Sequence, residues 1–286
     1  MDRVTVQSLR DMKKTGTRIA MLTCYDYSFA RILDDAGVDV LLVGDSLGMV
    51  TLGLDDTLPV TVEDMAHHTK AVVRGTRRAM VVTDMPFMSY QISDEKALEN
   101  AAYIMKTTGT HALKLEGGKR IASLVKKMTD AGIPVMGHLG LTPQSVLQFS
   151  GYGLQASGVD DAKELLEDSI ALQEAGAFAI VLEKIPAELA ELVTAGLSIP
   201  TIGIGAGPAC DGQVLVTNDM LGMYDKFLPK FVKKFANLKA TIDEAVKDYI
   251  TEVRADAFPA SEHSYHMDQN TLNRFMDEID RNLKEV

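Results

Sequence analysis

The sequence is poor in cysteine, in positive charge and in long apolar runs. Its 286 residues include only two cysteines, Cys24 and Cys210, which do not make a disulfide scaffold and lie in no metal-binding cluster. Acidic residues number 40 against 29 basic ones, and no basic stripe of the kind that binds nucleic acid is present. No uncharged apolar run could span a bilayer, and the first residues lack the basic-then-apolar pattern of a signal peptide. We therefore expect a reduced, cytoplasmic protein with no nucleic-acid or membrane partner.

A repeated unit of helix and strand runs along the chain. Each helix-like stretch ends in a small residue and a glycine, which readily adopts the left-handed conformation that caps helices. These ends are Ala36-Gly37, Thr108-Gly109, Ala131-Gly132, Ala175-Gly176 and Ala195-Gly196. The predicted strands are 19–25, 39–45, 79–84, 111–117, 134–139, 178–184, 200–205 and 214–218. Several are near-continuous apolar runs, which is typical of parallel strands covered on both faces.

This repeat predicts an α/β protein, a (β/α)8 TIM barrel with extra C-terminal helices. A doubly wound open sheet is the alternative, but no Gly-x-Gly-x-x-Gly motif opens a helix after the first strand. We place the catalytic barrel in residues 1–255 and a tail with one helix in residues 256–286.

The end of the chain has a different pattern. A Lys/Glu-rich helix is expected over 231–254, and a last helix has an apolar stripe. The stripe consists of Leu272, Phe275, Met276, Ile279 and Leu283. It must pack on something, and we expect this to be the barrel or a neighbouring subunit.

Reactive side chains stand at the carboxyl ends of the predicted strands. In a barrel these ends meet at one mouth, where active sites lie. The side chains expected there are Asp45, Ser46, Asp84, Lys114, Glu116, His138 and Glu183. Their convergence would make an active site.

Asp45 and Asp84 end neighbouring strands and would repel each other without a cation between them. A hard divalent ion with oxygen ligands, such as Mg²⁺, resolves this repulsion, although each aspartate alone could simply cap a helix. Lys114 and Glu116 are two apart on one strand and therefore face the same way. They could form an internal ion pair, or Glu116 could reach the metal while Lys114 holds an anionic substrate group.

His138 and Glu183 end the next two strands on the same rim. Glycines on both sides of His138 leave room beside the imidazole, although a lone histidine is more often structural. Glu183 follows an almost purely apolar run, and such surroundings suit a general base near neutral pH. A salt bridge from Glu183 to Lys184 or to another strand-end cation is the alternative.

Two loops are expected at the same mouth. Residues 52–61 follow the second strand and could act as a lid. Residues 203–208 are rich in glycine and end the seventh strand, where many barrels bind phosphate or other anions.

Residues 44–47 spell Gly-Asp-Ser-Leu, the nucleophile motif of GDSL-type serine hydrolases, in which Ser46 would attack an ester. That family also needs a Gly-x-Asn-Asp block and an Asp-x-x-His near the C-terminus. Here Val216 stands where the glycine should be, and the Asp-x-x-His from Asp64 to His67 comes far too early. The hydrolase remains a distant alternative.

The ordered set of motifs resembles the ketopantoate hydroxymethyltransferase family, whose barrel is of the phosphoenolpyruvate/pyruvate type. The resemblance runs from about residue 3 to about residue 255 and rests on long blocks in order, together with Glu183. The blocks are 22–26 (LTCYD), 43–48 (VGDSLG), 57–61 (TLPVT), 84–87 (DMPF), 114–118 (KLEGG), 137–144 (GHLGLTPQ), 203–207 (GIGAG) and 210–213 (CDGQ).

The resemblance implies a (β/α)8 barrel with a divalent metal, usually Mg²⁺. It implies transfer of a hydroxymethyl group from the co-substrate 5,10-methylenetetrahydrofolate to 3-methyl-2-oxobutanoate. The product would be ketopantoate, formed through a metal-stabilised enolate in the first step of pantothenate synthesis. A cytoplasmic homodecamer is also implied.

The same resemblance implies roles for residues already singled out. Asp45 and Asp84 correspond to metal ligands that also border the substrate, and Glu116 completes the metal site directly or through water. Ser46, Lys114 and His138 correspond to contacts with the keto acid, and Glu183 to the proton acceptor.

Two other functions compete with this one. A lyase of the phosphoenolpyruvate/pyruvate type also handles 2-oxo acid enolates, but its cysteine-bearing Lys-Lys-Cys-Gly-His loop is absent. A metal-dependent keto-acid-binding protein is the non-enzymatic alternative, in which Glu183 would have no base role.

Overall fold

The computed structural model describes residues 2–149, 151–223 and 229–283. The chain divides into two compact units, Met1–Ala236 and Asn237–Val286. The predicted division at residue 255 therefore falls inside the second unit. Each unit is described by itself below.

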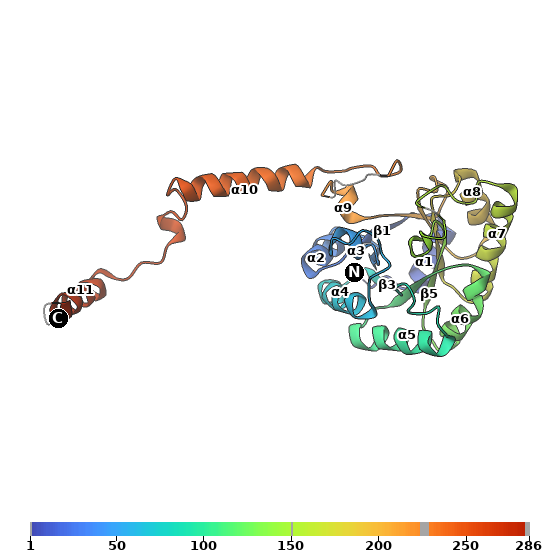
Figure 1. Ribbon diagram of the computed structural model, residues 1–286, viewed down its shortest axis with the longest axis horizontal. Helices are drawn as coiled ribbons and strands as arrows, with labels where there is room; N and C mark the ends of the chain where they lie inside the picture. Colours follow the sequence, from blue (N-terminus) through green and yellow to red (C-terminus); the bar gives the residue numbers. More distant parts are fainter. Residues whose placement is uncertain (1, 150, 224–228, 284–286) are drawn as a thin grey trace. The chain divides into compact units, whose positions relative to one another are not determined.

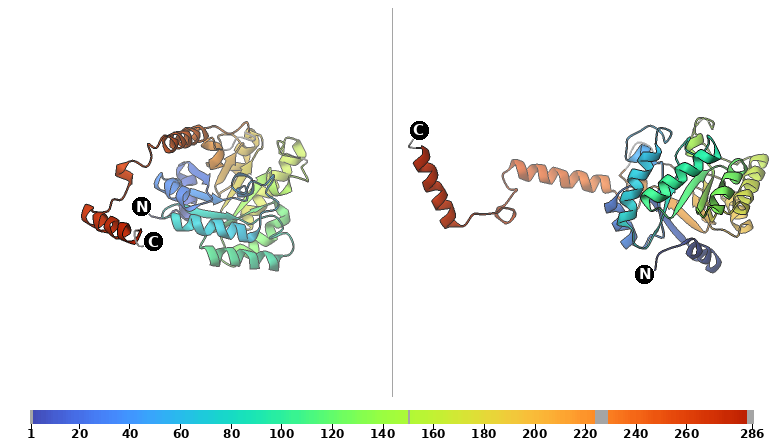
Figure 2. Two further views of the ribbon diagram at one scale, coloured as in Figure 1. Left: turned by 60° about the vertical axis from the view of Figure 1, so that its left-hand side comes forward. Right: turned by 90° about the horizontal axis from the view of Figure 1, so that it is seen from below.

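The first unit is a closed barrel of parallel strands, with helices around it (Figures 1 and 2). Each strand pairs with its neighbour in chain order, and β8 pairs with β1 to close the barrel. The predicted (β/α)8 fold is confirmed, and the open-sheet alternative is wrong. The strands are β1 (Ile19–Thr23), β2 (Val40–Val43), β3 (Met80–Asp84), β4 (Ala112–Glu116), β5 (Val135–Gly140), β6 (Ala179–Glu183), β7 (Thr201–Ile204) and β8 (Gly212–Leu215).

Helices follow most strands and surround the barrel, whereas the first helix precedes β1 and packs through Leu9 with the interior core. They are α1 (Val6–Thr15), α2 (Tyr27–Asp35), α3 (Leu47–Val50), α4 (Val62–Gly75), α5 (Asp94–Thr108), α6 (Lys119–Asp130), η1 (Pro143–Ser145), α7 (Val159–Glu174), α8 (Ala187–Gly196) and α9 (Thr217–Met220). The connection from β7 to β8 contains no helix, so one of the expected strand–helix units is incomplete.

Local sequence signals explain where these helices begin and end. Thr61 and Asp64 form a capping box at the start of α4, because each side chain accepts from the other's backbone N–H. Gly109 ends α5 with a φ of +76°, the left-handed conformation that glycine adopts without strain. Gly37, Gly132 and Gly176, which follow predicted helices in the same way, also have positive φ angles. Gly196 is not among the glycines with a positive φ; it ends α8 and is followed by an extended Leu197. The predicted left-handed cap at that position is wrong.

The inside and outside of the barrel are separate apolar layers, and strand β4 shows how they position the polar groups. Leu113 and Leu115 lie in the apolar core that includes buried residues of helices α5 to α8. Ala112 lies in the interior core together with Met80 and Met136 of the adjacent strands. Because side chains alternate along a strand, Lys114 and Glu116 point to the interior like Ala112. Both are buried, so two charged groups lie next to the apolar residues inside the barrel.

A close approach of β5 to β6 requires glycine at position 140. A Cβ there would lie 2.1 Å from the carbonyl oxygen of Glu183, and the φ of Gly140 is +89°. We expect Gly140→Ala to lower the free energy of unfolding by about 1–3 kcal/mol, because overpacking forces the backbone to shift. Denaturant unfolding measures this loss.

Gly132→Ala is the matched control, because Gly132 has a φ of +84° but nothing within 4 Å of its would-be Cβ. It isolates the conformational strain from the clash. Equal losses in the two variants would contradict the close-approach explanation.

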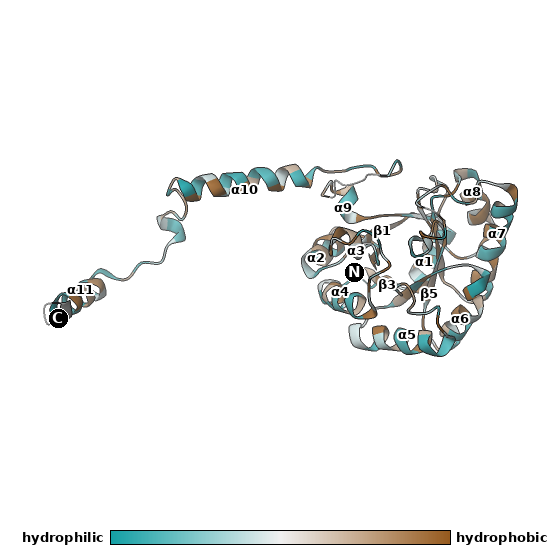
Figure 3. Ribbon diagram, in the orientation of Figure 1, coloured by the Kyte–Doolittle hydropathy of each residue, from teal (hydrophilic) through white to brown (hydrophobic). Residues whose placement is uncertain are grey.

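The second unit contains α10 (Leu238–Arg254), a short 3-10 turn η2 (Ser261–His263) and α11 (Gln269–Leu283). The helix predicted over 231–254 begins only at Leu238, because Phe231 packs at Gly205 of the barrel and the Phe235 N–H donates to the Met220 carbonyl. Apolar and polar residues alternate along α10 (Figure 3).

The apolar residues of α10 and α11 are exposed within this chain. They include Val246 and Tyr249 on α10 and Phe275 and Met276 on α11. The side chain of Leu283 lies outside the described residues. Packing of this stripe on the barrel or on another subunit stays a prediction. Among the described helices, none is long and apolar enough to cross a membrane.

Candidate active site

The carboxyl ends of β2 to β6 carry the predicted polar row. Asp45 and Ser46 directly follow β2, Asp84 ends β3, and Glu183 ends β6. Lys114 and Glu116 on β4 pair in register with Asp84 on β3 and with His138 on β5. Neighbouring members of the row are in contact, as the distances below describe.

Asp45 and Asp84 form a buried carboxylate pair. Asp84 Oδ2 accepts a hydrogen bond of 3.1 Å from the Asp45 backbone N–H. Burial raises the pKa of Asp45 well above its usual value, and the charges of Asp84 and Glu116 raise it further. Burial also raises the pKa of Asp84, although Lys114 partly offsets this effect. Such a pair binds a cation readily, because a cation removes the repulsion.

Lys114 lies among the acids. Its Nζ is 3.0 Å from Asp84 Oδ1 and 4.0 Å from Glu116 Oε1. Burial alone would lower the pKa of Lys114, but the carboxylates of Asp84, Glu116 and Asp45 raise it above its usual value. The amine therefore stays protonated and partly neutralises the group.

His138 bridges two carboxylates. Its Nδ1 lies 3.2 Å from Glu116 Oε1, and its Nε2 lies 3.2 Å from Glu183 Oε2. Burial and Lys114 lower the pKa of His138, but the two glutamates outweigh them and leave it raised. Burial acts to raise the pKa of Glu116, but this pKa is lowered overall, first by the close contact with His138. The alternative partner Lys184 instead donates to the Tyr152 carbonyl, so the cation facing Glu183 is His138.

Gln144 and Tyr90 hold the acids in place, and neither was assigned a role from the sequence. The Gln144 backbone N–H donates to Glu116 Oε2 over 3.0 Å, and its Nε2 donates to Asp45 Oδ2 over 2.9 Å. The Tyr90 hydroxyl donates to Gln144 Oε1 over 2.9 Å and accepts from the Glu116 backbone N–H over 3.1 Å. Gln144 belongs to the GHLGLTPQ block, so its motif was a signal that could have found it, whereas Tyr90 lies in a loop without one.

Ser46 has no base beside it. Its Oγ is 2.9 Å from the hydroxyl of Tyr25, and within the described ranges no histidine is hydrogen-bonded to it. Burial raises the pKa of Tyr25, so this hydroxyl stays neutral and does not activate the serine. The geometry therefore does not support a serine nucleophile.

Asp45, Asp84 and Glu116 are the candidate ligands of a divalent metal. In residues 2–149, 151–223 and 229–283, no three His, Cys, Asp or Glu side chains are arranged as a ready-made metal cluster. However, Asp84 Oδ1 and Glu116 Oε1 are buried and, among these residues, face the cations Lys114 and His138 without a hydrogen bond of good geometry. Asp45 and Asp84 are adjacent oxygen donors of the type that Mg²⁺ prefers, so the donor set fits the ion. Lys114 Nζ lies between Asp84 and Glu116, which keeps Glu116 apart from that pair.

The glycine-rich end of β7 uses its glycines for packing. A Cβ at Gly205 would lie 2.7 Å from the ring of Phe231, and one at Gly207 would lie 2.5 Å from Cβ of Ala187. Close packing therefore accounts for both glycines without an anion. Residues 51–60 form turns and bends after α3, and their movement as a lid stays a prediction.

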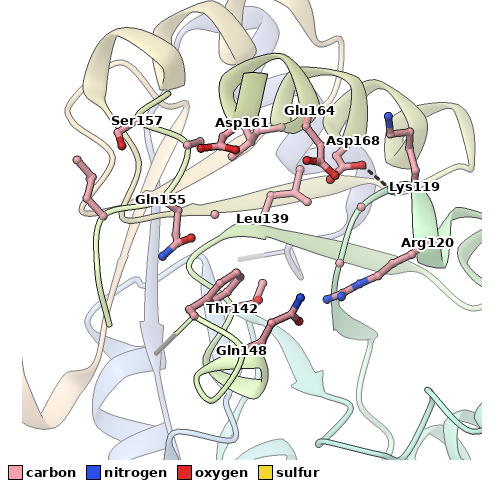
Figure 4. Close-up of a pocket in the computed structure, with 17 residues that line it drawn as sticks. Lys119, Arg120, Leu139, Thr142, Gln148, Gln155, Ser157, Asp161, Glu164 and Asp168 are labelled. Carbon is pink, nitrogen blue, oxygen red and sulfur yellow. Dashed lines mark hydrogen bonds between the residues drawn. The ribbon is translucent and has the colours of Figure 1, made fainter. Parts of the chain in front are cut away.

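Three hollows lie near the rim. One, of about 460 Å³, is lined by the β4–α6 loop, the end of β5 and α7, and contains no predicted site residue (Figure 4). Asp168 accepts from the Lys119 N–H over 2.8 Å and thereby occupies the start of α6. A second, of about 560 Å³, is lined by Glu116, Tyr90 and Gln144. The third, of about 170 Å³, is mainly apolar and is lined by Ser46 and Glu183. The second and third hollows therefore adjoin the candidate site.

Asp45→Asn tests the strain in the carboxylate pair. Because the folded-state pKa of Asp45 is raised, ionised Asp45 destabilises the metal-free protein once the pH rises through its unfolded pKa toward the folded value. We expect the metal-free variant to melt a few degrees higher than the parent near neutral pH, with the difference shrinking in acid. Calorimetry in the presence of a chelator measures both. A lower melting temperature near neutral pH would contradict this reading.

Comparisons with known proteins show the family of this chain. The family model for ketopantoate hydroxymethyltransferase matches residues 3–261. A 3-methyl-2-oxobutanoate hydroxymethyltransferase from Syntrophus aciditrophicus (strain SB) is 59% identical over 263 residues, covering 92% of this chain and 97% of that protein. One from Carboxydothermus hydrogenoformans (strain ATCC BAA-161 / DSM 6008 / Z-2901) is 58% identical over 274 residues, covering 96% and 99%.

Solved structures of low identity share the fold. A phosphonopyruvate hydrolase has a TM-score of 0.61 at 11% identity, covering 100% of this chain and 99% of that chain. A 2,3-dimethylmalate lyase of the PEP mutase/isocitrate lyase superfamily has a TM-score of 0.57 at 18% identity, covering 100% of both chains. The family match and the relatives together establish that this chain is an enzyme that belongs to the ketopantoate hydroxymethyltransferase family.

Proposed function

We propose that this enzyme transfers a hydroxymethyl group from 5,10-methylenetetrahydrofolate to 3-methyl-2-oxobutanoate and forms ketopantoate, the first step of pantothenate synthesis. The observation that carries the proposal is the contiguous row from Asp84 through Lys114, Glu116 and His138 to Glu183, which is buried except for the half-buried Glu183. The row contains carboxylate oxygens that can bind a metal, cationic side chains that can bind the carboxylate of a keto acid, and a carboxylate that can accept a proton. The names of the relatives support the substrate.

Asp45 and Asp84 would hold a divalent ion, with Mg²⁺ the expected one, and Glu116 would join directly or through water. Such an ion supplies Lewis-acid stabilisation of the negative charge that develops when C3 of the keto acid loses its proton. Gln144 keeps the Asp45 and Glu116 carboxylates fixed through its two hydrogen bonds. Oriented in this way, the carboxylates need little rearrangement when a ligand binds.

The cations and Ser46 would bind the keto acid. Lys114 and His138 are adjacent, with Lys114 Nζ 3.1 Å from His138 Nδ1, and both have raised pKa values. They offset the charge of the substrate carboxylate. The Ser46 hydroxyl, held by Tyr25, is placed to donate a hydrogen bond.

Glu183 would act as the general base. It takes the proton from C3, and the resulting enolate carbon attacks the methylene carbon carried by folate. A water molecule supplies the hydroxyl oxygen, both C–N bonds of the methylene carbon break, and the two folate nitrogens take up the proton from C3 and one from water as tetrahydrofolate leaves. Glu183 is only partly buried, unlike Glu116, and it borders the apolar hollow, so its carboxylate can reach a keto acid bound beside it.

Three further features stay predictions of the resemblance. They are the cytoplasmic location, the homodecamer and the identity of the metal as Mg²⁺. The exposed apolar faces of α10 and α11 are compatible with subunit packing.

The direct test is product formation from 3-methyl-2-oxobutanoate and 5,10-methylenetetrahydrofolate with Mg²⁺ present. We expect ketopantoate and tetrahydrofolate in equal amounts, measured by mass spectrometry. Membership of the family counts against the hydrolase, lyase and binding-protein alternatives. Cleavage of the keto acid without use of folate would revive the lyase.

A further inference from the structure

The apolar hollow beside Glu183 has one acidic group that the proposed reaction does not use. Hydrophobic side chains make up most of its lining, including Met49, Val50, Ile204 and Phe231. Asp219 of α9 is the other carboxylate that lines it, besides Glu183. An acid in an apolar wall is costly unless a donor pairs with it.

One carboxylate oxygen of Asp219 is buried without a hydrogen-bond partner among the described residues. The residue is 9% exposed, and its Oδ1 accepts no hydrogen bond from any described residue. Burial raises its pKa to about 6, which Lys234 partly offsets, so the carboxylate remains mostly ionised at neutral pH. An ionised buried oxygen without a donor is a vacant acceptor.

Local structure fixes the position of this acid. The Thr217 backbone N–H donates to Thr23 Oγ1 over 3.0 Å, which ties α9 to the end of β1. The Asp219 N–H donates to the Val216 carbonyl over 3.1 Å. These two bonds hold the backbone of Asp219 at the wall of the hollow without a ligand, which contributes to preorganisation.

We propose that this hollow receives the pterin ring of the folate co-substrate, with Asp219 accepting hydrogen bonds from its N3–H and 2-amino group. The inference rests on the proposed function, because it assigns the folate contact of that same site. A 2-amino-4-oxopyrimidine edge presents two adjacent donors, which match the two oxygens of one carboxylate.

The rest of the hollow suits a flat heteroaromatic ring. Phe231, whose ring is fixed against Gly205, offers an aromatic surface, and the aliphatic side chains cover the remaining faces. Glu183 and Ser46 line the same hollow, so a pterin held there carries its methylene carbon toward the keto acid. A pterin in the hollow and a keto acid beside Glu183 would therefore be adjacent.

The test is direct binding of 6-methyltetrahydropterin and of p-aminobenzoylglutamate, the two parts of the co-substrate, by anaerobic calorimetry with Mg²⁺ and 3-methyl-2-oxobutanoate present. We expect Asp219→Asn to weaken binding of 6-methyltetrahydropterin by about tenfold or more, because hydrogen bonds to a charged acceptor are lost. Binding of p-aminobenzoylglutamate should not change. Asp35→Asn, which removes the same charge from an exposed position on α2 outside the hollow, should change neither.

Exchange of the keto acid's C3 proton in D₂O, which needs no folate, should proceed in Asp219→Asn as in the parent. Unchanged pterin affinity in Asp219→Asn would overturn the inference, while the proposed function would stand if exchange persists in the parent. If the parent protein itself did not exchange the C3 proton, the proposed function would be refuted instead. Equal loss of both ligands would also overturn the inference, because it indicates general damage to the hollow.

Discussion

Replacing Glu183 with glutamine is expected to slow exchange of the C3 proton of 3-methyl-2-oxobutanoate by roughly 100-fold or more, the scale of general-base catalysis. Glutamine keeps the size of the side chain but cannot accept the proton. It can still accept a hydrogen bond from His138 Nε2, which lies 3.2 Å from the carboxylate. The surrounding row should therefore stay in place, and binding of the keto acid should persist.

Proton exchange is measured by NMR in D₂O with Mg²⁺, and keto acid binding by calorimetry. Glu188→Gln is the matched control, because Glu188 is an exposed glutamate of α8 that lies outside the hollow. Exchange in Glu183→Gln near the parent rate would show that another group takes the proton. His138 would then be the next candidate, because it lies between Glu116 and Glu183.

Asp84→Asn is expected to weaken Mg²⁺ binding by about 100-fold or more, because even residues that only support metal ligands contribute about 10–100-fold. The amide keeps the shape of the side chain and loses its charge. Lys114 Nζ, 3.0 Å from Asp84 Oδ1, would lose one of its two nearby carboxylates but keep Glu116. The protein should therefore fold, and its circular dichroism spectrum checks this.

Calorimetric titration with Mg²⁺ measures the affinity. Asp35→Asn, at an exposed position on α2, removes the same charge far from the predicted row and should leave the affinity unchanged. If Asp84→Asn bound Mg²⁺ as tightly as the parent, Asp84 would not be a ligand. Asp45 and Glu116 would then have to hold the ion without it.

The sequence alone predicted the barrel and most of the row at its mouth. In a sequence, buried parallel strands are continuous apolar runs, so a polar residue at the end of such a run is easy to recognise. Asp84 and Glu183 stand out in this way, and strand alternation correctly placed Lys114 and Glu116 on one side. The roles of individual residues came from the resemblance, and they remain predictions.

Contacts between distant segments could not be predicted in the same way. The bond from Gln144 to Asp45 joins residues 99 positions apart, and no local pattern specifies it. Tyr90 was missed because an aromatic residue in a loop has many possible partners. Asp219 is conspicuous only once the hollow around it is known.

The errors have local causes. The helix predicted over 231–254 starts at Leu238, because the apolar residues before it pack on the barrel unit. The glycine-rich segment after β7 is a different case, because Gly205 and Gly207 allow close contacts with Phe231 and Ala187 while anion binding there stays a prediction. Composition does not distinguish these two uses of glycine.

Metal-dependent proton exchange by the unaltered protein tests the proposed chemistry of the whole row. The protein is incubated in D₂O with 3-methyl-2-oxobutanoate and no folate, with Mg²⁺ or with a chelator, and the C3 signal is followed by NMR. The proposal predicts exchange with Mg²⁺ and its loss with the chelator. Absence of exchange while calorimetry confirms bound Mg²⁺ and bound keto acid would contradict it.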